Sequence, residues 1–115
     1  MSRAAGTRFE RLAAQFLQRA GFRVLRTNYT CRGGELDLVC DDAGTLVFVE
    51  VRMRASDRHG TPGETVGATK QRRVIHAARH YLATHELDDV PCRFDVIAIT
   101  VEDERIEHFR DAFQS

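Results

Sequence analysis

The sequence of 115 residues has no tryptophan and a single lysine, Lys70, since the other sixteen of its seventeen basic residues are arginine. Its three cysteines are odd in number and show no Cys-x-x-Cys spacing, so we expect a reducing, cytoplasmic setting. No apolar run approaches the ~20 residues that a membrane-spanning helix needs, and no signal-peptide pattern precedes the first helical pattern. These absences argue against a secreted disulfide scaffold and against a membrane protein.

Several enzyme signatures are also missing. No glycine-rich fingerprint opens a helix, so the nucleotide-binding loops are excluded. The serines lie in no nucleophile context. His76 and His80 stand four residues apart, but without a His-Glu-x-x-His motif or an obvious third ligand they make a weak zinc site. The side chains that remain for chemistry are carboxylates and arginines.

Length and composition predict one globular domain over residues 1–115, with 43% hydrophobic and 30% charged residues. The net charge is zero but unevenly spread. Residues 1–80 hold 14 basic and 8 acidic residues (14 − 8 = +6), and residues 81–115 hold 3 and 9 (3 − 9 = −6). The first part of the chain therefore offers a basic surface for a polyanion.

Hydrophobic periodicity and turn residues predict an α/β fold. The expected elements are a helix over residues 6–20, a strand over 22–26, a connection over 28–33, a hairpin over 33–54, a loop over 55–67, a helix over 68–85, a strand over 93–101 and a short edge strand over 106–109. A hairpin followed by a helical crossover implies a mixed sheet flanked by helices, with the core order αβββαβ.

The hairpin is unusual because acids occupy its strands. Glu35 and Asp37 share one face of the first strand, and Glu50 shares a face of the second with Arg52 and Arg54. The opposite face of the second strand carries Val47, Val49, Val51 and Met53, which require a core. If residues 42–45 form the turn, Asp37 lies opposite Glu50, whereas a turn over residues 41–44 places Glu35 there.

Either register brings like charges together, which destabilises a sheet unless something compensates. A divalent cation such as Mg²⁺ would turn the repulsion into ligation, because hard cations bind carboxylate oxygens. The alternative is a solvated sheet face with Glu50 paired to Arg52 or Arg54. Glu10 in the first helix has a similar alternative, namely a surface ion pair with a neighbouring arginine.

The motifs as a set resemble a known family. They are Gly6-x-x-x-Glu10, Asn28, Gly34-Glu35-Leu36-Asp37-Leu38-Val39, Val47-Phe48-Val49-Glu50-Val51-Arg52-x-Arg54, Lys70, Tyr81-Leu82 and Arg93-Phe94-Asp95-Val96. Together they resemble the YraN-like family of small bacterial proteins, which is related to archaeal Holliday-junction resolvases within the PD-(D/E)xK nuclease superfamily. The resemblance covers nearly the whole chain and implies a restriction-endonuclease-like fold.

The resemblance also implies an active site. Asp37 and Glu50 would be its central carboxylates, joined by Glu10, and together they would hold one or two Mg²⁺ ions, with Mn²⁺ as a substitute. Such sites usually carry a lysine two residues after the glutamate, and here that position is Arg52. Arginine holds a phosphate but keeps its proton, so a lysine role falls to Lys70, provided that the second helix starts beside the site.

The function implied is metal-dependent hydrolysis of phosphodiester bonds in DNA, with branched or repair-intermediate DNA as substrate and a homodimer as the assembly. The expected catalytic residues are Asp37, Glu50, Arg52 and Lys70, and the expected contacts to DNA are Arg32, Arg52, Arg54, Lys70 and Arg73. The alternative is a catalytically weak nuclease-like fold that binds nucleic acid or a protein partner.

Overall fold

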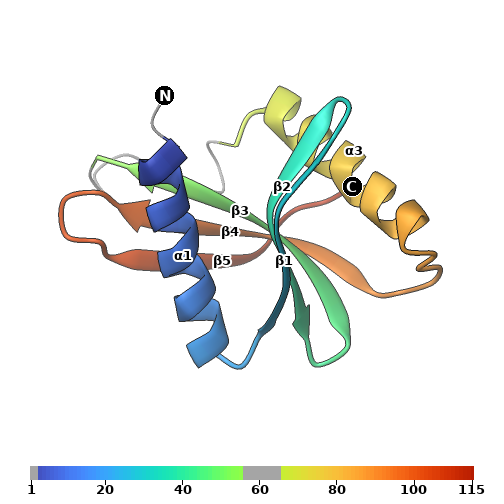
Figure 1. Cartoon of the computed structure of the whole chain (residues 1–115), viewed down its shortest axis with the longest axis horizontal. Coiled ribbons are helices and arrows are strands. Elements are labelled where there is room, and N and C mark those ends of the chain that lie inside the picture. Colours follow the sequence, from blue (N-terminus) through green and yellow to red (C-terminus); the bar gives the residue numbers. More distant parts are fainter. Residues whose placement is uncertain (1–2, 56–65) are drawn as a thin grey trace.

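The structure is a computed structural model that describes residues 3–55 and 66–115 (Figure 1). Its elements are α1 (Arg3–Arg19), β1 (Arg23–Cys31), β2 (Gly34–Asp42), β3 (Thr45–Arg54), α3 (Ala68–Thr84), β4 (Cys92–Thr100) and β5 (Ile106–Phe113). This order confirms the expected αβββαβ core, and β5 follows it as a last strand.

All five strands form one mixed sheet in the order β1-β2-β3-β4-β5. The first three strands pair antiparallel, since each follows the last through a short turn. Between β3 and β4 the chain crosses back through α3, so β4 runs in the same direction as β3 and pairs parallel to it. β5 then pairs antiparallel to β4. The predicted mixed sheet is confirmed.

One helix covers each face of the sheet. Phe9, Ala13 and Leu17 recur at four-residue spacing on α1 and pack in one buried cluster, which includes Val47 and Val49 of β3. α3 belongs to a second cluster with the alternate residues of the same strand, through buried side chains such as Val74 and Tyr81. Because successive strand residues point to opposite faces, the two clusters lie on opposite sides of the sheet.

The turn between β2 and β3 settles the register that the sequence left open. Asp42 pairs with Thr45, which leaves Ala43 and Gly44 as a two-residue turn with φ angles of 51° and 96°. Positive φ at both central residues is typical of tight hairpins. The first of the two registers is therefore confirmed, and its continuation places Asp37 opposite Glu50.

The expected connection over residues 28–33 is wrong, because β1 continues to Cys31. β1 is an edge strand with mostly exposed side chains, so its sequence lacks the alternation that marks a half-buried strand. Its backbone pairing to β2 holds it in the sheet instead, across an irregularity between Val24 and Arg26. The last strand is likewise longer than expected and reaches Phe113.

Two further expectations concern the end of β3. Met53 does not enter the core, since it is 49% exposed at the second-last position of β3. The expected loop over residues 55–67 lies mostly outside the described residues, which resume at Val66.

No helix in the described ranges is both long and apolar enough to cross a membrane.

Candidate functional site: a buried carboxylate pair and a lysine

Asp37 and Glu50 lie where β2 and β3 separate. The recorded pairing of the two strands runs from the turn to Leu38 and Val49, one residue short of the acids. Beyond this point the Asp37 side chain links the two strands, because its Oδ2 accepts a hydrogen bond of 2.8 Å from the Val51 backbone N–H. The carboxylate of Asp37 is thereby fixed against β3, on the strand that carries Glu50.

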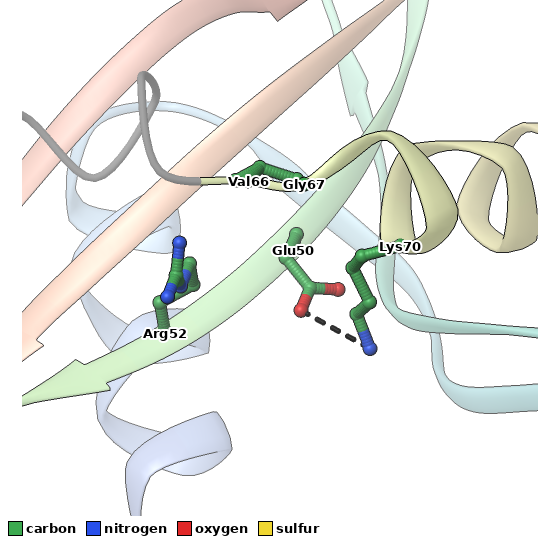
Figure 2. A pocket seen from close by; sticks show the side chains of 5 residues that line it. All are labelled: Glu50, Arg52, Val66, Gly67 and Lys70. Carbon is green, nitrogen blue, oxygen red and sulfur yellow. Dashed lines mark ion pairs between the residues drawn. The ribbon is translucent and has the colours of Figure 1, made fainter.

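Glu50 is buried although it is an acid. Its side chain is 7% exposed, and its Oε2 lies 3.4 Å from the Nζ of Lys70 (Figure 2). The other carboxylate oxygen, Oε1, is buried and has no hydrogen-bond donor within residues 3–55 and 66–115. A buried acceptor without a donor costs free energy, so Glu50 is only partly compensated by the protein around it.

Lys70 reaches the site from the first turn of α3, just after the N-cap residue Gly67. A close contact between α3 and β2 makes this possible: a Cβ atom at Gly34 would lie 2.3 Å from the Arg73 carbonyl oxygen. His76 adds a second link, because its Nε2 lies 2.9 Å from the Arg32 carbonyl oxygen in the β1–β2 turn. The condition on which the role of Lys70 depended, that the helix start points into the site, is met.

The electrostatics follow from this burial. Burial and the neighbouring Asp37 carboxylate raise the pKa of Glu50 to about 8. Burial also raises the pKa of Asp37 above its usual range, although the hydrogen bond from Val51 works against it. Two close carboxyl groups titrate as a pair, so the raised pKa values belong to the pair and not to either residue alone.

The pKa of Lys70 is raised as well. Partial burial works against its charge, but the carboxylate of Glu50 and those of Asp37 and Glu35 outweigh that effect. Lys70 is therefore an ammonium ion and acts as the counter-ion of the acid pair. A lysine in this state donates hydrogen bonds and stabilises negative charge, and it cannot accept a proton.

A cavity of about 190 Å³ opens beside the pair, lined by Glu50, Arg52, Val66, Gly67 and Lys70 (Figure 2). A water molecule takes up about 30 Å³ in the liquid, so the cavity has room for several waters or for one phosphate group. Arg52 and Lys70 lie on either side of Glu50 at this cavity (Figure 2). The cavity thus offers two cationic side chains to an anion and one carboxylate to a cation.

Comparison with known proteins places this arrangement in a family. The model of the Uncharacterised protein family UPF0102 matches residues 9–99. The chain belongs to the UPF0102 family. It is 50% identical over 109 residues to a UPF0102 protein of Nitrosomonas europaea (94% of this chain, 92% of the relative) and 46% identical over 107 residues to one of Syntrophus aciditrophicus (91% and 84%). A UPF0102 protein of Burkholderia ambifaria is 49% identical over 115 residues (99% and 79%).

UPF0102 is the family that the sequence resemblance indicated, so the YraN-like assignment is confirmed. The description of UPF0102 names no activity, ligand or partner.

Glu10 is the third acid expected at this UPF0102 site. With Arg11, Ala14, Thr27 and Asn28 it lines a second cavity of about 220 Å³ between α1 and β1. The pairing of β1 with β2 places Asn28 level with Asp37. Within residues 3–55 and 66–115, no three side chains of Asp, Glu, His or Cys gather as a group that could hold a metal ion. The structure brings Asp37 and Glu50 together, and the participation of Glu10 stays a prediction.

The arginines expected at DNA divide into two groups. Arg54 is bound within the protein, because its guanidinium donates to Thr100 Oγ1 at 3.2 Å and pairs with Glu107. Arg32 and Arg73 are exposed, on the β1–β2 turn and the start of α3, which the Gly34 contact holds together. Their placement leaves their side chains accessible to an extended anion next to the cavity.

Sequence reasoning missed one member of the site. Glu35 Oε1 lies 3.7 Å from the Nζ of Lys70, so this ammonium stands between Glu35 and Glu50. The signal was present, because Glu35 precedes Asp37 by two residues and therefore starts on the same face of the strand. The face was recognised, but the partner of Glu35 depends on a helix that lies far along the chain.

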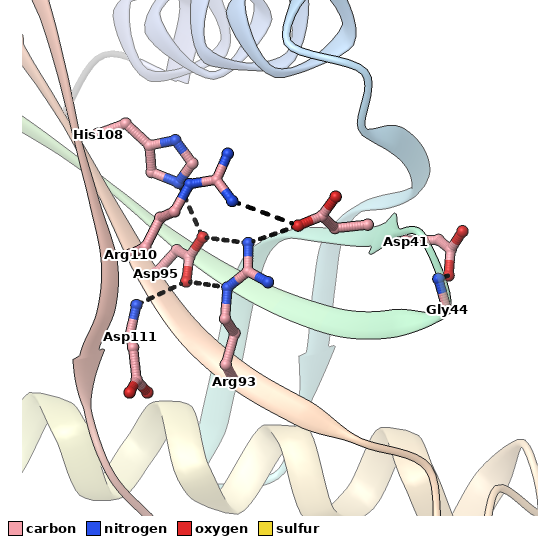
Figure 3. A network of polar contacts seen from close by, with 8 residues as sticks. Asp41, Gly44, Arg93, Asp95, His108, Arg110 and Asp111 are labelled. Atoms are coloured by element: carbon pink, nitrogen blue, oxygen red, sulfur yellow. Dashed lines mark hydrogen bonds and ion pairs between the residues drawn. The ribbon is translucent and has the colours of Figure 1, made fainter.

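It also missed a polar cluster on the opposite face of the sheet, where Asp95 of β4 pairs with Val49 of β3. Asp95 is fully buried, and its carboxylate binds the guanidinium of Arg93, His108 Nε2 at 2.8 Å and the Asp111 backbone N–H at 3.0 Å (Figure 3). These bonds hold the pKa of Asp95 below its usual range, despite its burial. Asp95 is thus a satisfied structural acid, in contrast to Glu50.

Proposed function

We propose that this chain is a Mg²⁺-dependent DNA endonuclease of the PD-(D/E)xK superfamily, with branched DNA as its preferred substrate. The observation that carries the proposal is the buried pair of Asp37 and Glu50 at the point where β2 and β3 separate, with the Lys70 ammonium 3.4 Å from Glu50. The preference for branched DNA rests on the resemblance to archaeal Holliday-junction resolvases.

The residues present fit a magnesium ion. Carboxylate oxygens are the ligands that Mg²⁺ prefers, and Asp37 and Glu50 lie in adjacent strands with raised pKa values. Glu50 Oε1 is a buried acceptor that no described residue satisfies, and a cation would satisfy it. Asp37 and Glu50 would hold the ion, and Glu10 is the proposed third ligand. When bound, such an ion polarises the scissile phosphate and lowers the pKa of a water ligand.

The chain's own cations would then act on the substrate. Lys70 is held as an ammonium beside the cavity, where it can orient the attacking water and stabilise negative charge on the phosphate. Arg52 lines the same cavity and offers a second, permanently charged donor to a phosphate oxygen. Such sites usually carry a lysine two residues after the glutamate, and Arg52 occupies that position here. In this proposal Lys70 takes the role of that lysine.

The DNA strand would continue over the exposed arginines. Arg32 and Arg73 lie on the two segments that meet at Gly34, and Lys70 is on the same helix end as Arg73. Contacts of this kind neutralise phosphates without reading bases. They therefore support recognition by backbone shape, as a structure-selective nuclease requires.

The test is a cleavage assay with branched and linear duplex DNA in Mg²⁺ or Mn²⁺. Wild-type protein is compared with Asp37→Asn and Glu50→Gln, which keep the shape of each side chain, and with Glu102→Gln as a matched change at an exposed glutamate. We expect wild type and Glu102→Gln to cut branched DNA equally. Each site variant should lose at least about 100-fold in rate, since removal of one stabilising group from an active site costs that much.

Cutting that survives both site substitutions would overturn the proposal. No cutting by wild-type protein, with DNA binding retained, would instead favour a nuclease-like fold that binds nucleic acid without hydrolysis.

A further inference from the structure

Lys70 stands between two carboxylates in different surroundings. Its Nζ lies 3.4 Å from Oε2 of Glu50, whose side chain is 7% exposed, and 3.7 Å from Oε1 of Glu35, whose side chain is 46% exposed. Lys70 itself is 38% exposed. The ammonium thus lies on the boundary between the buried acid pair and the solvent, with one anion on each side.

The site has more acids than cations when all of its groups are ionised. Asp37, Glu50 and Glu35 contribute three negative charges, and Lys70 and Arg52, which line the cavity with Glu50, contribute two positive charges, which leaves −1 (−3 + 2). A divalent cation bound by Asp37 and Glu50 would compensate these two carboxylates in place of Lys70. The same cation would repel the ammonium of Lys70, because both positive charges would then be placed at Glu50.

We propose that Glu35 is a positioning residue for Lys70: when Asp37 and Glu50 hold a divalent cation, Lys70 leaves Glu50 and pairs with Glu35. The inference rests on the metal site of the proposed function and assigns a role to an acid outside the expected set. Glu35 is already within ion-pair distance, so a change of side-chain rotamer suffices and α3 stays in place.

This exchange of partners keeps Lys70 at the cavity. With its charge neutralised by Glu35 at the solvent edge, Lys70 remains beside the entrance of the cavity that it lines with Arg52. Without Glu35, the ammonium would have no other ion-pair partner among the described residues to replace Glu50. It would then be repelled into solvent, and the cation would bind against a competing charge.

The experiment is a double-mutant cycle read out as Mg²⁺ affinity, by titration calorimetry at one pH. It compares wild type, Glu35→Gln, Lys70→Met and the double variant, with Glu102→Gln as the control for loss of an exposed acid. We expect Glu35→Gln to weaken Mg²⁺ binding about fivefold, the effect of one exposed ion pair. Lys70→Met should tighten binding, because a competing cation is gone, and in that background Glu35→Gln should change the affinity less than about twofold.

The proposal is overturned if Glu35→Gln weakens Mg²⁺ binding as much in the Lys70→Met background as in wild type, since Glu35 would then act on the cation directly. So would an unchanged affinity in Glu35→Gln. Should Glu35→Gln unfold, Glu35→Asp serves in its place, and it should bind Mg²⁺ more weakly than wild type only when Lys70 is present. A wild-type protein that binds no Mg²⁺ removes the proposed function itself, which is a distinct result from a cycle without coupling.

Discussion

At the scale of single residues, the contrast between Glu50 and Asp95 separates function from structure. Both are buried acids in neighbouring strands. Asp95 is surrounded by donors that hold its pKa low. Burial raises the pKa of Glu50, and one of its oxygens has no donor in the part of the chain that the structure describes. A buried group with a strongly raised pKa and an unmet acceptor is a candidate for function, and a satisfied one is a part of the fold.

The raised pKa of Glu50 predicts how stability depends on pH. A carboxyl group whose pKa is higher in the folded state makes the protein less stable as pH rises between its unfolded and folded values, here from about 4.5 to about 8. Glu50→Gln removes this group. In EDTA at pH 9 we therefore expect Glu50→Gln to be more stable than wild type by roughly 2–4 kcal/mol, with a much smaller difference at pH 5.

Urea denaturation at several pH values measures the difference. Glu102→Gln, an exposed change of the same kind, should follow the wild-type curve. If Glu50→Gln and wild type lose stability in parallel as pH rises, the acid pair is not repulsive and the interpretation of the site fails.

At the scale of elements, the contact between β2 and α3 decides where Lys70 lies. Gly34 is packed so closely that a methyl group would meet the Arg73 carbonyl at 2.3 Å and the backbone nitrogen of Ala77 at 3.1 Å. Backbone atoms of a helix cannot give way singly. Gly34→Ala should therefore push α3 away from β2 and cost about 2 kcal/mol or more of stability.

Thermal and urea unfolding of Gly34→Ala would measure this cost. Gly67→Ala is the control, because a Cβ atom at Gly67 meets nothing within 4 Å and should change stability by less than about 1 kcal/mol. A Gly34→Ala variant as stable as the control would show that α3 tolerates displacement, and Lys70 would then not be fixed over the acids.

The sequence predicted the order of elements because α3 and the hairpin have clear periodicity, and it placed Asp37 and Glu50 on one face because strand residues alternate. It did not predict the full length of β1, whose exposed side chains carry no pattern. The sequence did not predict the position of Lys70 either. That position depends on how closely α3 approaches Gly34, which is a contact between distant parts of the chain that local pattern does not contain.

At the scale of the whole molecule, the proposed binding of DNA by a neutral chain depends on segregation of its charges. The exposed arginines Arg32 and Arg73 lie together near the cavity, while Arg54 is occupied by Glu107. We expect Arg32→Ala and Arg73→Ala each to weaken DNA binding for all sequences alike. The slope of log K against log salt concentration should decrease by about one for each substitution.

Fluorescence anisotropy over a range of salt concentrations gives both quantities. Arg19→Ala is the matched control, since Arg19 ends α1 on the other face of the sheet. If Arg19→Ala lowers the slope of log K against log salt concentration as much as Arg73→Ala does, DNA does not bind preferentially on the α3 side. The expected homodimer is a separate prediction, which sedimentation of the protein with and without branched DNA would test.

The central claim is that Lys70 completes the acid pair as a metal-dependent nuclease centre, and Mg²⁺-dependent cleavage of branched DNA by Lys70→Met tests it most directly. At saturating Mg²⁺ we expect wild-type protein to cut and Lys70→Met to be at least about 100-fold slower, while it remains folded and still binds Mg²⁺. Lys70→Arg, which keeps the charge, should fall between the two. Cleavage by Lys70→Met at the wild-type rate would contradict the account.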